Sequence, residues 1–318
     1  MDPSFSFPHP TLPRLPLFFG TAVRPMIEGA DCFDALDQAM EAGVHAIDTA
    51  RGYGQAEAVL GRWMKARANR KEILLLSKCG DVQAGRVHLD RQVIEEELAQ
   101  SLDALQTDYI DLYLLHRDDP KTPIGESLET LHEAQQKGLI RYYGVSNWRH
   151  ERIIEANAYA HAHGMAGFAL SSPNFGLALQ VEDPWGGDCV TLTGPQNQKA
   201  RAFYRKSGMP VLSYSSLARG FFSGHFQSGD WAGARKVLDG PAQKAYLCAE
   251  NMDRLQRAEI LAQKKGQPVA RLALSYLFSK GLPLYAVVSM MQKDHLMANI
   301  EAATHPLSAG EVAYLEEG

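Results

Sequence analysis

Four side chains that could carry out proton transfer stand at similar places in the sequence. Asp48, Lys78 and His116 each lie at or near the end of an apolar run typical of a buried strand. Tyr53 follows Asp48 by five residues, in the glycine-flanked turn Gly52–Gly54. An acid, an ammonium, an imidazole and a phenol together suit protonation of a carbonyl oxygen.

The lysine explains how the tyrosine of this set could act as an acid. A tyrosine of ordinary pKa, about 10, is a poor acid at neutral pH, but a nearby ammonium stabilises its phenolate. A carboxylate beside that lysine keeps it charged and oriented. Each residue also has a structural interpretation: a turn tyrosine, a buried ion pair, a polar histidine. The catalytic interpretation depends on the four occurring together at consecutive strand ends.

The elements that must position these groups alternate between strands and helices. Unbroken apolar runs such as Ile73–Leu76 indicate strands buried on both faces. Apolar residues three or four apart, as in the run from Ile94 to Leu105, indicate helices. The predicted strands are 17–21, 44–49, 72–79, 108–116, 140–146, 168–172, 210–215 and 284–289. The predicted helices are one capped by Asp31 and stopped by Gly43, then 56–68, 90–106, 123–137, 151–163, 196–206, 252–265, 269–279 and 293–303.

Eight strands, each followed by a helix, favour a closed (β/α)₈ barrel over an open sheet. The first strand leads into Gly20–Pro25 and carries neither the glycine fingerprint nor the P-loop of an open nucleotide-binding sheet. We expect one domain over residues 1–318, with an irregular lead-in at 1–16. Two long connections, 173–195 and 220–250, are expected to be lids or binding loops at the C-terminal face. Chemistry in such barrels sits at that face.

Composition narrows the class of function. The 318 residues carry a net charge of −5 with no basic block, which argues against a nucleic-acid partner. No apolar run is long enough to span a membrane, and the N-terminus does not resemble a signal peptide. Four scattered cysteines suit a reducing compartment, so we expect a cytoplasmic protein. Eleven histidines show no convergent ligand spacing, so no metal is expected.

Three segments make the sequence similar to a known family. IDTARGYGQAEAVLG (47–61), DYIDLYLLHRDDP (108–120) and GLIRYYGVSNW (138–148) resemble the aldo-keto reductases, and the resemblance runs from about 18 to 315. It implies an NAD(P)H-dependent enzyme that reduces a small aldehyde, ketone or sugar. Tyr53 would be the general acid, Lys78 would lower its pKa, Asp48 would hold Lys78, and His116 would orient or polarise the carbonyl.

The resemblance also implies a cofactor site in the second half of the chain. Ser146 and Asn147 would bind the nicotinamide carboxamide, and Tyr214 would stack on the nicotinamide ring. The remaining matches are Ser215, Leu217 and Arg219 at the pyrophosphate and Asn299 at the adenine. Ser172 replaces the glutamine that the family places after strand six, and Ser289 and His295 stand where many members have the lysine and arginine that bind the NADPH 2′-phosphate. Lys293 lies nearby, so the preference between NADPH and NADH stays open.

The substrate site is the least determined part. Trp148, Arg51 and Arg117 adjoin the motif residues and are expected to line it, the arginines favouring a polar or anionic substrate unless Asp118 and Asp119 pair with them. Asp111, in mid-strand, is expected to be a buried structural carboxylate. Two other functions remain: a cofactor-binding regulatory subunit of the same fold, and a metal-dependent sugar isomerase. The oligomeric state and the substrate are not predicted.

Overall fold

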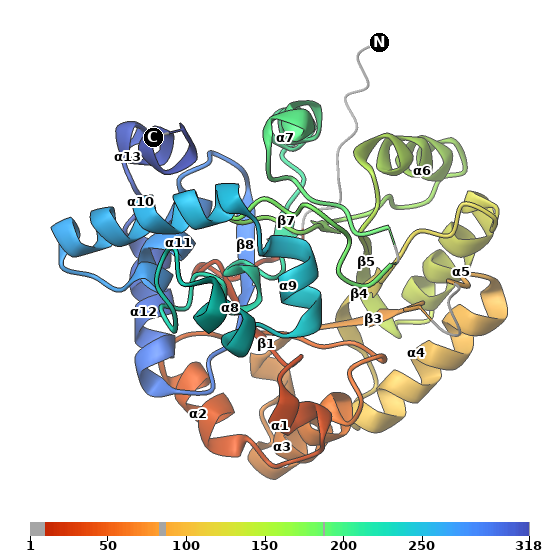
Figure 1. Ribbon diagram of the computed structural model, residues 1–318. Coiled ribbons are helices and arrows are strands. Elements are labelled where there is room, and N and C mark those ends of the chain that lie inside the picture. Colours follow the sequence, from red (N-terminus) through yellow and green to blue (C-terminus); the bar gives the residue numbers. More distant parts are fainter. Residues whose placement is uncertain (1–9, 83–86, 187, 318) are drawn as a thin grey trace.

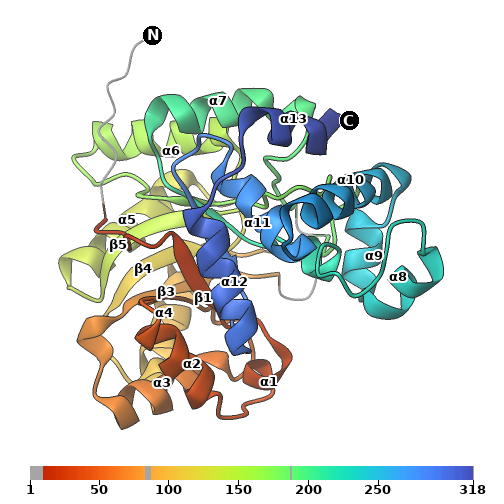
Figure 2. The same cartoon turned by 90° about the vertical axis from the view of Figure 1, so that its left-hand side faces the viewer.

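The computed structural model describes residues 10–82, 87–186 and 188–317, and its strands form one closed, wholly parallel barrel in chain order. Figures 1 and 2 show the barrel surrounded by helices. The strands are β1 (Leu17–Gly20), β2 (Ala46–Asp48), β3 (Leu74–Cys79), β4 (Ile110–Leu115), β5 (Ile140–Ser146), β6 (Ser171–Ser172), β7 (Val211–Ser213) and β8 (Leu284–Val288). All eight predicted strands are confirmed, and so is the barrel.

Thirteen α-helices occur in the described residues. They are α1 (Arg24–Ile27), α2 (Phe33–Glu41), α3 (Ala56–Arg67), α4 (Arg91–Leu105), α5 (Ile124–Gln136), α6 (His150–Ala162), α7 (Gln198–Ser207), α8 (Trp231–Val237), α9 (Gly240–Tyr246), α10 (Ala249–Lys265), α11 (Val269–Phe278), α12 (Lys293–Thr304) and α13 (Ala309–Glu317). No helix among these described parts is long and apolar enough to cross a bilayer.

The alternation of side chains along a strand places the chemistry inside the barrel. Ala46, Leu76 and Leu114 belong to the small apolar cluster that fills the barrel interior. Successive strand residues point to opposite faces, so residues two positions further on point inward again. Those residues are Asp48, Lys78 and His116. The apolar interior thus ends, at its C-terminal mouth, in three polar side chains.

The connection 220–250 is more ordered than the sequence analysis expected. It contains α8 and α9, which Figure 2 shows grouped with α10 on one side of the barrel. Both α8 and α9 begin with an aspartate cap: Asp230 accepts from the Gly233 amide and Asp239 from the Ala242 amide. The connection 173–195 has turns and isolated bridges instead, with a single 3₁₀ turn at its end.

The predicted cap of α2 is wrong. Cys32 occupies the cap position without a side-chain capping hydrogen bond to the helix, and Asp31 pairs with Arg62 at 2.8 Å. The helices α1 and α13 were also missed, the first because it is a single turn with a proline as its second residue.

The N-terminal end of the barrel is held by ion pairs. Asp111 is buried and accepts hydrogen bonds from the Leu75 amide at 3.0 Å and from Arg70 at 2.9 Å, while Arg141 lies 3.0 Å away. The Tyr109 ring lies 4.0 Å from the Arg70 guanidinium and 4.3 Å from that of Arg141. Asp111 therefore has the structural role expected of it.

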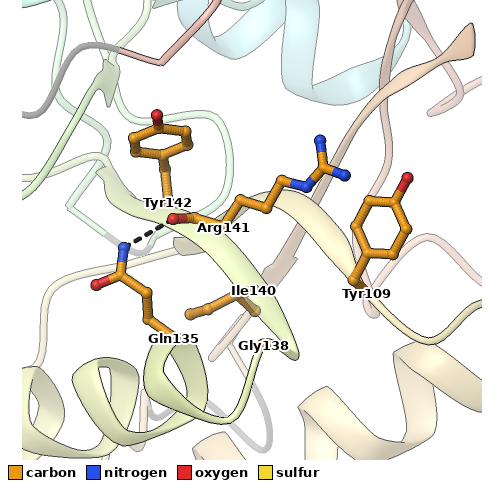
Figure 3. Close-up of a pocket in the computed structure, with 6 residues that line it drawn as sticks. All are labelled: Tyr109, Gln135, Gly138, Ile140, Arg141 and Tyr142. Carbon is orange, nitrogen blue, oxygen red and sulfur yellow. Dashed lines mark hydrogen bonds between the residues drawn. The ribbon is translucent and has the colours of Figure 1, made fainter. Parts of the chain in front are cut away.

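A hollow of about 590 Å³ opens beside this cluster, far from the C-terminal mouth along the strands. Figure 3 shows the residues around it, which come from the starts of β4 and β5 and from the end of α5. The Gln135 side chain donates to the Arg141 backbone carbonyl there at 2.7 Å. Polar groups that line this hollow, such as those of Gln135 and Arg141, thus make contacts within the fold.

Removing the buried carboxylate should be costly. Asp111→Ala leaves Arg70 without its partner and the Leu75 amide without an acceptor, so we expect a loss of about 3 kcal/mol in the free energy of unfolding. Urea unfolding measures this directly. Arg24→Ala, which breaks the exposed pair with Glu28, is the control and should leave the midpoint unchanged. Equal midpoints for the two variants would contradict the assigned role.

Candidate active site

The ammonium of Lys78 is the centre of the site. Its Nζ donates to Asp48 Oδ1 at 2.6 Å, to the Thr49 carbonyl at 2.9 Å and to the Tyr53 hydroxyl at 3.3 Å. The side chains of Lys78 and Asp48 are both 4% exposed. A buried ammonium needs such compensation, and here its three donors have three oxygen partners.

The turn that carries Tyr53 is tied to β3 and to α1. The Arg51 amide donates to the Lys78 carbonyl at 3.0 Å, which extends the pairing of β2 with β3 towards Tyr53. Gly54 has φ +56°, and a Cβ there would lie 2.7 Å from the Ile27 carbonyl oxygen. The turn thus requires glycine for both conformation and space. It holds the phenol over the ammonium.

His116 approaches the same phenol from β4. Its amide donates to the Cys79 carbonyl at 2.7 Å, and its ring meets the Tyr53 ring edge to face with 5.7 Å between centroids. Burial lowers the pKa of His116 to about 3, against the attraction of Asp81. The imidazole is therefore neutral at physiological pH and acts without a charge of its own.

At Tyr53 and Lys78, burial and the nearby charges shift the pKa in opposite directions. Burial raises the pKa of Tyr53 and outweighs the nearby Lys78 ammonium, so the net shift is opposite to the one expected from the lysine alone. Burial by itself would lower the pKa of Lys78, but Asp48 and Tyr53 overcome it and the pKa is raised. The site therefore holds a protonated phenol beside a charged ammonium. That is the state a proton donor needs.

The residues expected at the nicotinamide end come together at the ends of β5 to β7. Asn147 adopts φ +59°, and its amide oxygen accepts from the Tyr214 hydroxyl at 2.6 Å and from the Val190 amide at 3.2 Å. The Asn147 amide nitrogen donates to Ser146 at 3.1 Å. Ser146 and Ser172 then donate to the carbonyls of the next strand, each at 2.8 Å.

The residues expected along the rest of the cofactor follow β7 and β8. Ser215 and Arg219 both have left-handed backbones, at φ +50° and +52°, with Leu217 between them. Arg219 forms an ion pair with Asp239 and lies 5.3 Å from the Trp185 ring. On the other side Asn299 donates to the Ser289 carbonyl at 3.1 Å, and Ser289, Lys293 and His295 are exposed.

This donor set fits a dinucleotide. In chain order, amide and hydroxyl groups end β5 and β6, a guanidinium lies in the tight turn after β7, and a buried amide lies in α12 after β8. Such groups suit, in that order, a carboxamide, a pyrophosphate and a purine. Within the described residues, no three or more His, Cys, Asp or Glu side chains are placed to hold a metal.

Two of the three expected substrate residues face elsewhere. Trp148 is 2% exposed, donates to the Arg117 carbonyl at 3.0 Å and packs on Phe168, so it belongs to the core. Arg51 pairs with the buried Glu57 at 3.1 Å and with Gln100, towards α3 and α4. We correct both assignments.

Arg117 follows His116 at the C-terminal end of β4, but it does not pair with Asp118 or Asp119, the acids considered first. It donates to Cys189 Sγ at 2.9 Å and lies 3.6 Å from Asp81. Asp118 pairs with Arg152, and Asp119 accepts from Thr122.

The structure adds three residues that sequence reasoning missed. Asp81 lies 3.8 Å from His116 Nδ1, while Trp185 and Cys189 come from the connection 173–195 and contact Arg117. Asp81 had a usable signal, because it follows β3 by two residues and strand ends in a barrel converge. The other two had none, since contacts of irregular loops are not periodic.

Comparison with known proteins agrees with this geometry. A model of the aldo/keto reductase family matches residues 16–318. The chain belongs to that family. It is therefore an oxidoreductase of a family that uses NAD(P)H and acts on small carbonyl compounds.

Curated relatives align along most of the chain. Aldo-keto reductase str7 of Strobilurus tenacellus is 28% identical over 88% of this chain and 79% of its own length. Norsolorinic acid reductase B of Dothistroma septosporum is 28% identical over 89% of this chain and 71% of its own length. A probable aryl-alcohol dehydrogenase, AAD4 of Saccharomyces cerevisiae, is 27% identical over 89% and 86%.

The role of Lys78 can be tested through the ionisation of Tyr53. Lys78→Met removes the charge that opposes burial, so the kinetic pKa of the tyrosine should rise further and turnover should fall at least about 100-fold. The pH dependence of kcat/KM measures the first effect. Cofactor binding, followed by fluorescence, should persist. An unchanged rate would reduce Lys78 to a structural ion pair.

Proposed function

We propose that the chain is an NAD(P)H-dependent carbonyl reductase in which Tyr53 is the general acid. The observation that carries the proposal is the contact of one buried ammonium, Lys78, with both the Asp48 carboxylate and the Tyr53 hydroxyl. Such a contact has one clear use. Burial keeps the phenol protonated at rest, and the ammonium stabilises the phenolate once the proton has gone.

Each residue then has one task. Tyr53 gives its proton to the carbonyl oxygen as the carbonyl carbon becomes an alcohol carbon, and Lys78 stabilises the phenolate that remains. Asp48 fixes the position and charge of Lys78. His116, neutral and edge-on to Tyr53, orients the carbonyl. A bound nicotinamide would supply the hydride, held at its carboxamide by Ser146, Asn147 and Ser172 and across its ring by Tyr214.

The proposed substrate is a small aldehyde, ketone or sugar, and Arg117 borders its site. The names of two relatives mention an aryl alcohol and norsolorinic acid, which is the reason to include aromatic aldehydes among the compounds screened. Arg219, Ser215 and Leu217 would face the pyrophosphate, and Asn299 the adenine.

Tyr53→Phe tests the acid directly. The variant keeps the ring but removes the proton, so carbonyl reduction should fall by about 10²–10⁴-fold while NADPH affinity stays close to that of the wild type. Steady-state rates with a panel of carbonyls, together with fluorescence titration of NADPH, measure both quantities. Turnover above about a tenth of the wild-type value would exclude Tyr53 as the acid.

Cofactor choice should be relaxed. Discrimination for NADPH comes from charge-assisted bonds to the 2′-phosphate, and in the described sequence after Ser289 the basic side chains nearest to it are Lys293 and His295. We expect a preference of less than about 100-fold for either cofactor, or about 2.7 kcal/mol. Values of kcat/KM with both cofactors decide it, and an NADPH preference above about 1,000-fold contradicts the proposal.

A further inference from the structure

The residues at the carboxyl end of β3 include an acid that the proposed reaction does not use. The Asp81 side chain lies between the two groups that follow β4, with its oxygens 3.8 Å from His116 Nδ1 and 3.6 Å from Arg117 Nε. These distances exceed hydrogen-bond length but lie within the range of strong charge interaction. Asp81 thus influences both neighbours through its charge.

The chain around Asp81 is built to present it at the mouth. Gly80 has φ +71°, and its amide donates to the Glu97 carboxylate at 2.9 Å. Asp81 Oδ1 accepts from the Val82 amide at 2.9 Å. On the other side, a Cβ added to Gly52 would lie 2.9 Å from Asp81 Oδ2. The carboxylate therefore fits against the turn that carries Tyr53.

Charges at the mouth are balanced in pairs. Lys78 pairs with Asp48, Arg219 with Asp239, and Arg117 with Asp81. The Asp48 side chain is only 4% exposed, whereas that of Asp81 is 33% exposed and lies beside His116. An arriving substrate thus meets the Asp81 charge on the side where its carbonyl must be oriented.

We propose that Asp81 is a specificity-determining and positioning residue, which offsets Arg117 and makes the site select uncharged carbonyl compounds over anionic ones. The inference rests on the proposed reductase function. It also revises the first expectation from the sequence, in which Arg117 favoured an anionic substrate. A guanidinium that already faces a carboxylate attracts a second one weakly, and the partly exposed Asp81 side chain repels it.

Two aldehydes of similar shape separate charge from size. 4-Nitrobenzaldehyde is neutral and 4-carboxybenzaldehyde is anionic at neutral pH, and kcat/KM for each is measured with saturating NADPH. The wild type should prefer the neutral aldehyde. Asp81→Asn keeps the shape of the side chain, and it should reduce this preference about tenfold, mainly by lowering KM for the anionic aldehyde. Higher salt should weaken the wild-type preference, because the charge is partly exposed.

Two further variants control the comparison. Asp118→Asn makes the same change at an acid that pairs with Arg152, and it should leave the ratio of the two kcat/KM values unchanged. Combining Asp81→Asn with Arg117→Gln removes the cation that would receive the substrate carboxylate, so the gain for the anionic aldehyde should disappear. Non-additivity of this kind identifies a direct coupling.

A pH profile adds a readout that a purely structural role would not change. The groups that act on Tyr53 are Lys78 from β3, Asp48 from β2, His116 from β4 and Asp81, and Asp81 helps to raise the pKa of the phenol. In Asp81→Asn the alkaline limb of kcat/KM for the neutral aldehyde should therefore move to lower pH.

The outcomes are distinct. A fall in kcat/KM by one common factor for both aldehydes, with an unmoved pH profile, would overturn the role of Asp81 and leave the reductase proposal intact. Failure of the wild type to reduce either aldehyde with NADPH or NADH would overturn the proposed function for aromatic aldehydes, and this inference with it.

Discussion

The whole site depends on one ammonium kept charged inside an apolar barrel. An isolated buried charge is expensive, and Lys78 is tolerated because Asp48, the Thr49 carbonyl and the Tyr53 hydroxyl surround it. Those partners come from β2 and the turn after it. The pairing of β2 with β3 must therefore keep its register without a shift of even one residue. A slip by one position would turn Lys78 to the outer face. The strand register that closes the barrel is therefore also the register that brings Lys78 to its partners.

The two ends of the barrel use buried charge for different purposes. At the N-terminal end Asp111 is enclosed by two arginines and a strand amide, and these contacts are complete without any ligand. At the C-terminal end the charges face a mouth, where Asp81 and Arg117 keep distances longer than a hydrogen bond. The first arrangement stabilises the fold, whereas the second leaves interactions to be strengthened by a bound molecule.

Much of the fold was accessible from the sequence because it follows from periodicity. Buried parallel strands appear as unbroken apolar runs, and all eight were found with their order. The candidate proton-transfer residues came from the same pattern, since Asp48, Lys78 and His116 lie at strand ends that converge, and their role stays a prediction. Other features were not periodic. Trp148 follows the Ser146–Asn147 pair, yet its ring packs into the core against Phe168, and only tertiary contacts reveal this. The net rise in the pKa of Tyr53 depends on its degree of burial, which no motif records.

The distribution of roles around the barrel has a consequence for how this enzyme could change over evolutionary time. The proposed proton-transfer residues come from β2, β3 and β4, whereas the candidate cofactor residues come from the ends of β5 to β8 and from α12. The described residues of the connection 173–195 contact Arg117, which follows His116, and also Asn147 and Tyr214 of the candidate cofactor group. Mutational drift in that loop can therefore alter what is recognised while the reaction centre stays fixed. Laboratory evolution towards a new substrate would best begin there, with residues 46–54 and 74–79 held constant.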